Sequence, residues 1–182
     1  MIFIFSLVII LALIVIVLFS FPRFSPIPYF PSNYQDKDLI LQALDLKNNQ
    51  IIIDLGAGDG WVIFEAAKLA RRLSLNTKFI AVEINPVLII LLHIKRLLNS
   101  NKNNVAIIYG DIFAADFPKL TTDNRQLITI YIYISPWLIE KTVKIIKKQF
   151  GDFNIVSYFY PVKSLKRKEK VLRGKHNVYI YN

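Results

Sequence analysis

The chain has 182 residues, of which 54% are hydrophobic and 20% are charged, and its formal net charge is +10. This hydrophobic content excludes a disordered or collagen-like chain, and the length suits one folded domain. The absence of cysteine excludes disulfides, a thiolate nucleophile and cysteine-ligated metals, and with only two histidines we predict no metal site. The positive charge favours an anionic lipid surface, nucleic acid or an acidic protein as a partner.

The first 22 residues carry no charged side chain and are long enough, at about 1.5 Å per residue, to cross the hydrocarbon core of a bilayer. No basic residue precedes this stretch, as a cleaved signal peptide would require. We therefore predict a transmembrane anchor over residues 1–22. Since every Lys and Arg lies beyond it, the positive-inside rule predicts a single-pass membrane protein with its folded domain in the cytoplasm.

Four prolines between residues 21 and 31 disfavour helix and predict an extended linker over residues 23–34. From residue 35 to residue 182, short apolar runs alternate with amphipathic segments. Strands are predicted at 51–53, 79–83, 105–109, 127–134 and 153–160, and helices at 35–46, 61–72, 86–99 and 138–149. This alternation predicts an α/β, Rossmann-like fold with a mostly parallel sheet. The tail after residue 168 predicts a hairpin whose last strand is antiparallel.

A glycine-rich segment, DLGAGDG at residues 54–60, follows the first predicted strand and precedes a helix, as a nucleotide-binding loop must. Gly56, Gly58 and Gly60 allow the backbone to approach a ligand closely. Their spacing differs from that of the dinucleotide motif, and the carboxylate of Asp54 would repel a phosphate. A ligand with an ammonium group and no phosphate, such as S-adenosylmethionine (SAM), suits this segment better than NAD.

Two further acids end the next two predicted strands, and parallel strands bring their C-terminal ends to the same edge of a sheet. We expect Glu83 to accept both hydrogen bonds of a ribose diol, Asp111 to bind the adenine amino group and Ile112 to pack on the adenine ring. Taken singly, these residues suit a helix start or a turn equally well. Together with the glycine segment, in this order, they predict SAM binding.

These motifs resemble those of class I SAM-dependent methyltransferases. More narrowly, they resemble those of the membrane-anchored protein-lysine methyltransferases that include the mitochondrial ATP synthase c-subunit enzyme. The narrower resemblance also rests on PYFPS at residues 28–32, YISP at 133–136, VSY at 156–158 and HNVY at 176–179. It implies that Tyr29 and Pro31 lie near the cofactor and that the acceptor is a lysine. The predicted anchor, the cofactor motifs and the basic charge together predict that this lysine belongs to a membrane protein. Ser135 departs from the apolar residue that the resemblance leads us to expect.

Tyr133 and Trp137, near the end of the fourth predicted strand, are expected to line the channel of the acceptor amine, because aromatic rings bind cations. Trp137 equally suits a role in packing the helix that follows. The sequence SPW at residues 135–137 lacks the Asn or Asp before Pro-Pro that is typical of nucleobase methyltransferases, which argues against nucleic acid as the substrate. Two other functions stay open: methylation of a lipid or quinone, and SAM binding without catalysis.

Overall fold

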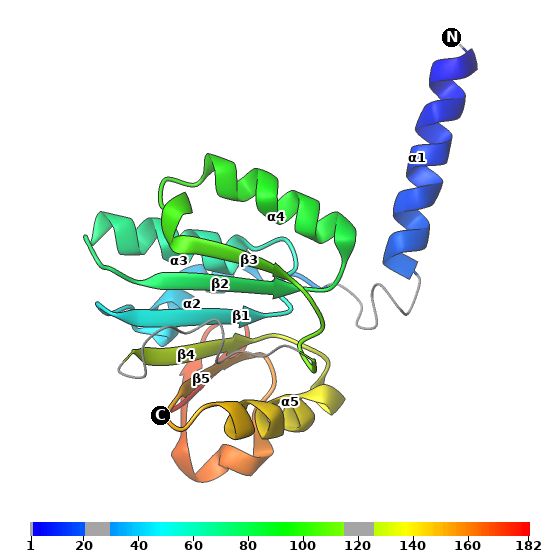
Figure 1. Ribbon diagram of the computed structural model, residues 1–182. Coiled ribbons are helices and arrows are strands. Elements are labelled where there is room, and N and C mark those ends of the chain that lie inside the picture. Colours follow the sequence, from blue (N-terminus) through cyan, green and yellow to red (C-terminus); the bar gives the residue numbers. More distant parts are fainter. Residues whose placement is uncertain (1, 21–29, 115–125) are drawn as a thin grey trace.

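The computed structural model describes residues 2–20, 30–114 and 126–182 (Figure 1). Its centre is a seven-stranded sheet with the strand order β3-β2-β1-β4-β5-β7-β6. The strands are β1 (Gln50–Leu55), β2 (Lys78–Glu83), β3 (Val105–Tyr109), β4 (Leu127–Ile132), β5 (Asn154–Tyr158), β6 (Glu169–Arg173) and β7 (Asn177–Tyr181). β1 to β5 pair in parallel, while β7 is antiparallel to both β5 and β6. The predicted Rossmann-like sheet, with its antiparallel end, is confirmed.

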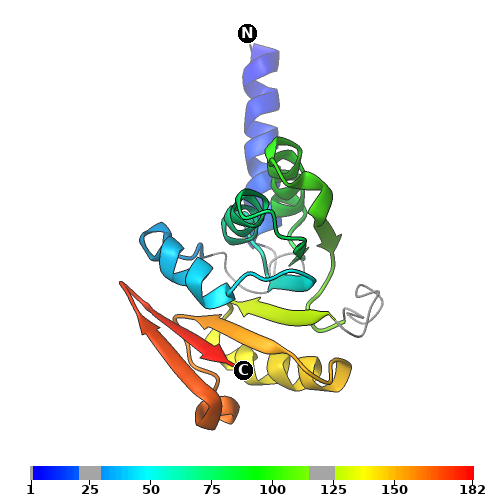
Figure 2. The same cartoon turned by 90° about the vertical axis from the view of Figure 1, so that its left-hand side faces the viewer.

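Helices cover both faces of the sheet (Figure 2). One face carries α2 (Lys37–Leu44), α3 (Trp61–Arg72) and α4 (Pro86–Leu98), and the other carries α5 (Pro136–Gln149). Every residue of β1 is buried, because its side chains alternate between the two apolar cores. The described residues also form the short 3₁₀ helices η1 (Tyr34–Asp36), η2 (Lys102–Asn104) and η4 (Lys163–Lys168). The parallel strands therefore deliver the ends of β1 to β4 to one edge of the sheet.

The N-terminal apolar stretch forms the helix α1 (Ile2–Ser20). No helix within the described ranges is long and apolar enough to cross a membrane. The predicted transmembrane anchor over residues 1–22 is therefore not supported. Residues 23–29 of the predicted linker lie outside the described residues, and residues 30–33 form neither helix nor strand.

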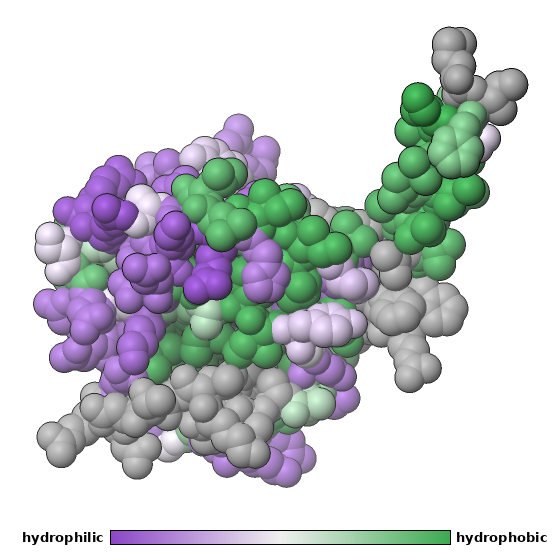
Figure 3. Space-filling view, turned by 45° about the horizontal axis from the view of Figure 1, so that its top comes forward, coloured by the Kyte–Doolittle hydropathy of each residue, from purple (hydrophilic) through white to green (hydrophobic). Residues whose placement is uncertain are grey.

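Apolar side chains are exposed along α1 and on the outer face of α4 (Figure 3). On α4, Ile90, Ile94, Leu97 and Leu98 are all more than half exposed. The opposite face of α4 packs Leu88 and Leu92 into the core. Because an isolated exposed apolar residue is ordinary but a row of them is not, this surface suits contact with an apolar partner.

Candidate functional site

A cleft lies at the C-terminal edge of the parallel strands. It is lined by residues 30–32, by the loop after β1, by the ends of β2 and β4, and by residues 111–113. The topology thus brings Asp54, Glu83 and Asp111 together, as their positions at strand ends predict. Asp54 and Glu83 are buried, whereas Asp111 is exposed at the rim.

The loop after β1 adopts the left-handed conformation at all three glycines, with φ of 77° at Gly56, 58° at Gly58 and 75° at Gly60. The amide of Gly56 donates to the carbonyl of Val82, and the amide of Gly58 donates to Oε2 of Glu83. These hydrogen bonds to β2 fix the conformation of the loop after β1. Gly56 and Gly58 line the cleft, whereas Gly60 begins α3 and lies against the core.

Gly60→Ala is expected to lower the free energy of unfolding by about 2 kcal/mol or more, because the new Cβ would overlap Phe64 and Leu92 and the positive φ disfavours any L side chain. Urea unfolding measures the effect. Gly151→Ala is the matched control, since nothing lies within 4 Å of a Cβ added there. Equal stability of the two variants would contradict this role of Gly60.

Backbone amides hold the carboxylate of Glu83 in position in the ligand-free protein. Its Oε1 accepts from the amides of Ile84 and Asn85, both at 2.8 Å, and its Oε2 accepts from Gly58, also at 2.8 Å. A carboxylate has about four acceptor positions, so at least one is left for a ribose hydroxyl. The side chain of Asn85, not that of Glu83, caps α4 by accepting from the amide of Val87.

Asp54 is 3% exposed and lies at the floor of the cleft. Burial raises the pKa of its carboxyl group to about 8, and the negative charges of Glu83 and Asp59 add to the effect. A cation bound beside Asp54 would favour the ionised form and relieve this penalty. Asp59 is paired with Lys95, whose Nζ donates to Oδ2 at 2.6 Å.

Asp111 and Ile112 also line the cleft. Oδ1 of Asp111 accepts from the amide of Phe113 at 2.8 Å, which is the bond of a turn. Ile112 is buried and presents an apolar surface to the cleft. The side chains expected to contact adenine are therefore in the cleft, and their contact with adenine remains a prediction.

A second cavity opens beside the cleft, and the two share the lining residues Pro31, Ser32, Trp61 and Tyr133. The remaining lining residues of the second cavity are Asn33, Tyr34, Tyr158 and His176. Indole Nε1 of Trp61 donates to the carbonyl of Ser32 at 2.9 Å, and the hydroxyls of Ser32 and Tyr131 are hydrogen-bonded at 2.7 Å. These bonds hold residues 31–33 against the sheet edge between the two cavities.

Only some of the predicted site residues line the two cavities. Pro31 and Tyr133 line both cavities. Trp137, by contrast, lies in the first turn of α5, is 75% exposed and lines neither of the two cavities described, so its role in the channel stays a prediction. Tyr29 lies outside the described residues. Sequence reasoning missed Trp61 as a lining residue, although its position directly after the glycine loop was a usable signal.

Comparisons with known proteins agree with this geometry. The family model described as ribosomal RNA adenine dimethylase matches residues 30–166. The chain is 30% identical over 164 residues to a protein-lysine N-methyltransferase of Saccharolobus islandicus, which covers 85% of this chain and 92% of that protein. It is 32% identical over 82 residues to a probable ribosomal RNA small subunit methyltransferase A of Methanosphaera stadtmanae, 45% of this chain but only 28% of that protein.

The fold is similar to the crystal structure of an RNA methyltransferase from Salinibacter ruber in complex with S-adenosyl-L-homocysteine. The TM-score is 0.67 at 21% identity, and the match covers 84% of this chain and 92% of that one. At this level of identity the likeness concerns the fold.

Proposed function

Because the chain belongs to the ribosomal RNA adenine dimethylase family and is a SAM-dependent methyltransferase, we propose that its methyl acceptor is the side-chain amine of a protein lysine. The lysine methyltransferase of Saccharolobus islandicus supports this proposal, since its similarity extends over nearly the whole of both chains. The similarity to the ribosomal RNA enzyme of Methanosphaera stadtmanae covers about a quarter of that protein.

The side chains that line the cleft match the chemical groups of SAM. Asp54, buried and with a raised pKa, suits the ammonium group of the methionine part, and Glu83 has acceptor capacity left for the ribose. Asp111 and Ile112 offer an acceptor and an apolar surface for adenine. When bound, SAM supplies an electrophilic methyl group. The residues of the chain then need to orient the acceptor in line with it and to exclude water.

The observation that carries the proposal is the aromatic passage out of the cleft. Trp61 and Tyr133 line both cavities, and Tyr34 lines the second one. Aromatic faces bind ammonium groups, and Tyr34 already does so at the rim, where Nζ of Lys37 lies 5.0 Å from its ring centroid. A lysine side chain is long and thin enough to enter such a passage with its ammonium group leading.

A second candidate is methylation of an adenine amino group in RNA. The family match and the net charge of +10 favour it. The aromatic rings of Trp61 and Tyr133 would suit a stacked nucleobase as well as an ammonium group. What favours lysine is the similarity to the lysine methyltransferase, which extends over 85% of this chain and 92% of that protein.

Labelled SAM distinguishes these acceptors. The protein is incubated with the soluble and membrane fractions of cells, and the products are treated with protease, with nuclease or with organic solvent. We expect protease-sensitive label, and mass spectrometry should locate the added methyl groups on lysine. The exposed apolar side chains of α1 and α4 favour an acceptor in the membrane fraction. Nuclease-sensitive label would establish the RNA candidate instead, and label in the solvent extract would indicate a lipid or quinone.

A further inference from the structure

Three polar side chains, those of Asp36, Tyr158 and His176, form a hydrogen-bonded network beside the second cavity, which Tyr158 and His176 line. Asp36, in η1, accepts the hydroxyl proton of Tyr158 at 2.7 Å and the amides of Lys175 and His176 at 2.8 and 3.1 Å. Nδ1 of His176 lies 2.8 Å from the hydroxyl of Tyr158 and 3.2 Å from Oδ2 of Asp36. The network therefore joins the start of the domain to β5 and to the β6–β7 hairpin.

These bonds determine which nitrogen of His176 carries the proton. A phenol has a single proton, and that of Tyr158 is donated to Asp36. Both neighbours of Nδ1 then present lone pairs, so Nδ1 must be the donor. Burial by itself would raise the pKa of Asp36, but the hydrogen bonds from Tyr158, from the amides of Lys175 and His176 and from the imidazole outweigh it and leave the pKa below its usual value. Asp36 is therefore an anion that holds Nδ1–H in place.

With Nδ1 protonated, Nε2 of the neutral imidazole keeps its lone pair. His176 lines the second cavity together with Tyr34, Trp61 and Tyr133, and this cavity adjoins the cofactor cleft. Its side chain is 28% exposed, whereas that of Asp36 is 2% exposed. The buried carboxylate of Asp36 thus orients His176, which remains accessible from the aromatic passage that the acceptor would enter.

We infer that His176, oriented by Asp36, is the base that removes the proton from the acceptor amine, an inference that rests on the proposed function. A lysine ammonium group has no lone pair and cannot attack a methyl group. Its proton passes to Nε2 of His176, and the neutral amine then forms the N–CH₃ bond as the S–CH₃ bond breaks. S-adenosylhomocysteine leaves, the methylated amine carries the positive charge, and His176 releases its proton to water.

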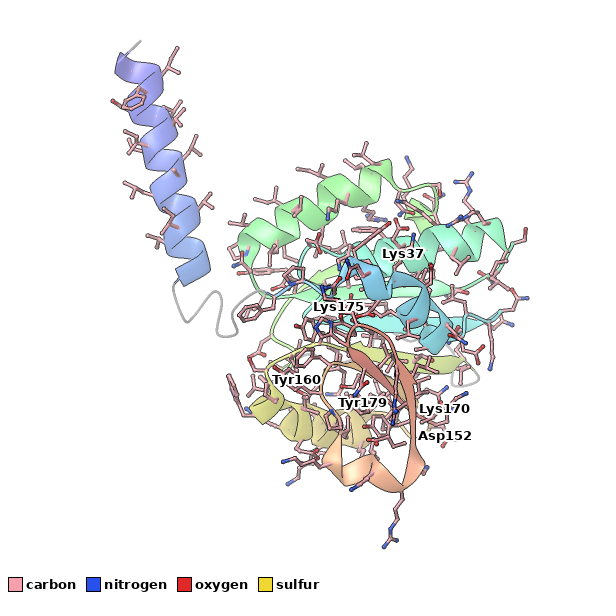
Figure 4. The ribbon with its side chains drawn as sticks, turned by 180° about the vertical axis from the view of Figure 1, so that it is seen from behind. Lys37, Asp152, Tyr160, Lys170, Lys175 and Tyr179 are labelled. Atoms are coloured by element: carbon pink, nitrogen blue, oxygen red, sulfur yellow. The ribbon has the colours of Figure 1, made fainter. Side chains whose placement is uncertain are left out.

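The charged and titratable groups around His176 suit this role. Asp36 and Tyr158 contact its ring, and Tyr133 and Tyr34 share the cavity with it. Burial raises the pKa of Tyr158 and also that of Tyr133, so both phenols stay neutral at physiological pH. Lys37 directly follows Asp36 in the chain, and Lys175 directly precedes His176. Both lysines lie on the side of the molecule that carries α2 and the β6–β7 hairpin (Figure 4).

His176→Asn tests the inference in the full chain. Asparagine places an amide nitrogen where Nδ1 stood, so the bond to Asp36 is retained while Nε2 is lost. With tetralysine as the acceptor and saturating SAM, we expect kcat at pH 7 to fall about a hundredfold. The deficit should shrink about tenfold for each pH unit above 7, as free amine forms without a base. The Kd of SAM and the unfolding midpoint should not change. His93→Asn, at the exposed histidine of α4, is the matched control.

Nitrogen NMR of the wild-type protein gives a second, independent readout. We expect the proton of neutral His176 on Nδ1, and a proton on Nε2 would overturn the inference even if the variant fails to fold. If the wild type methylates tetralysine and His176→Asn keeps its kcat and pH profile, the inference fails and the proposed function stands. If the wild type methylates neither tetralysine nor any protein in the cell fractions, the proposed function fails and the role of His176 falls with it.

Discussion

Asp54→Asn is expected to weaken SAM binding about a hundredfold and, at the same time, to stabilise the ligand-free protein at neutral pH. Asparagine keeps the shape of the side chain but removes the charge that faces the ammonium group of SAM. Loss of one partner of a buried charged pair costs about 2–5 kcal/mol, a range that includes the roughly 2.7 kcal/mol of a hundredfold loss of affinity. Calorimetric titration measures it directly.

The gain in stability follows from the pKa of Asp54, which burial and the charges of Glu83 and Asp59 raise from 3.8 to about 8. Between these two pH values, the folded ligand-free protein binds more protons at this site than the unfolded chain does. Its stability therefore falls as the pH rises through this window, by up to about 1.4 kcal/mol per pH unit. Asp54→Asn removes this dependence, so its stabilising effect should vanish below pH 3.8 and be greatest near pH 8.

The same titration links SAM binding to pH. Below pH 8, wild-type Asp54 must release a proton when the ammonium group binds, so the affinity for SAM should rise with pH up to about 8. Titrations in two buffers of different ionisation enthalpy detect the released proton, and Asp54→Asn should release fewer protons. Asp45→Asn is the control, because Asp45 is exposed and pairs with Lys47 on the surface. Unchanged SAM affinity in Asp54→Asn would mean that the ammonium group binds elsewhere.

Most of the fold was predictable because the parallel strands are buried on both faces and read as continuous apolar runs. β1 is the clearest case, with all six residues buried. Boundaries were less accurate where an apolar run continues past the pairing. β4 was predicted to reach residue 134, but its ladder ends at Ile132, and the next residues turn toward the two cavities.

The cofactor side of the site was predictable for a similar reason. Asp54, Glu83 and Asp111 each stand at or just after a strand end, so local sequence together with parallel pairing brings them to one edge. The acceptor side depends on contacts between distant segments. Asp36 and His176 are 140 positions apart and meet only because β7 pairs antiparallel with β5.

The direction in which Trp137 points depends on the helix that contains it. An aromatic residue after a strand that ends at the site was expected to face the acceptor, but a residue at the first turn of a helix can point to either side. Here α5 presents Ile139 and Val143 to the core and leaves Trp137 in solvent. Trp61, at the corresponding first turn of α3, is the aromatic residue that faces the two cavities.

Glu83→Gln is expected to lower the affinity for SAM at least tenfold and the free energy of unfolding by about 1–3 kcal/mol. Oε2 accepts from the amide of Gly58, and Oε1 accepts from the amides of Ile84 and Asn85. Whichever way the glutamine amide turns, its NH₂ group faces at least one of these donors, and a buried donor then loses its acceptor. The glycine loop should become less well held, and the ribose should lose a charge-assisted hydrogen bond.

These two effects can be separated by the choice of ligand. S-adenosylhomocysteine and its 2′,3′-dideoxy analogue differ only in the ribose hydroxyls, so the ratio of their Kd values reports the contact with Glu83 alone. We expect the wild type to prefer the hydroxylated ligand by tenfold or more and Glu83→Gln to lose most of that preference, because the coupling between two groups in contact is what such a cycle measures. Glu65→Gln is the control, since Glu65 is bonded to exposed Lys68 on α3. If Glu83→Gln folds and keeps the full preference, Glu83 supports the glycine loop without contacting the ribose.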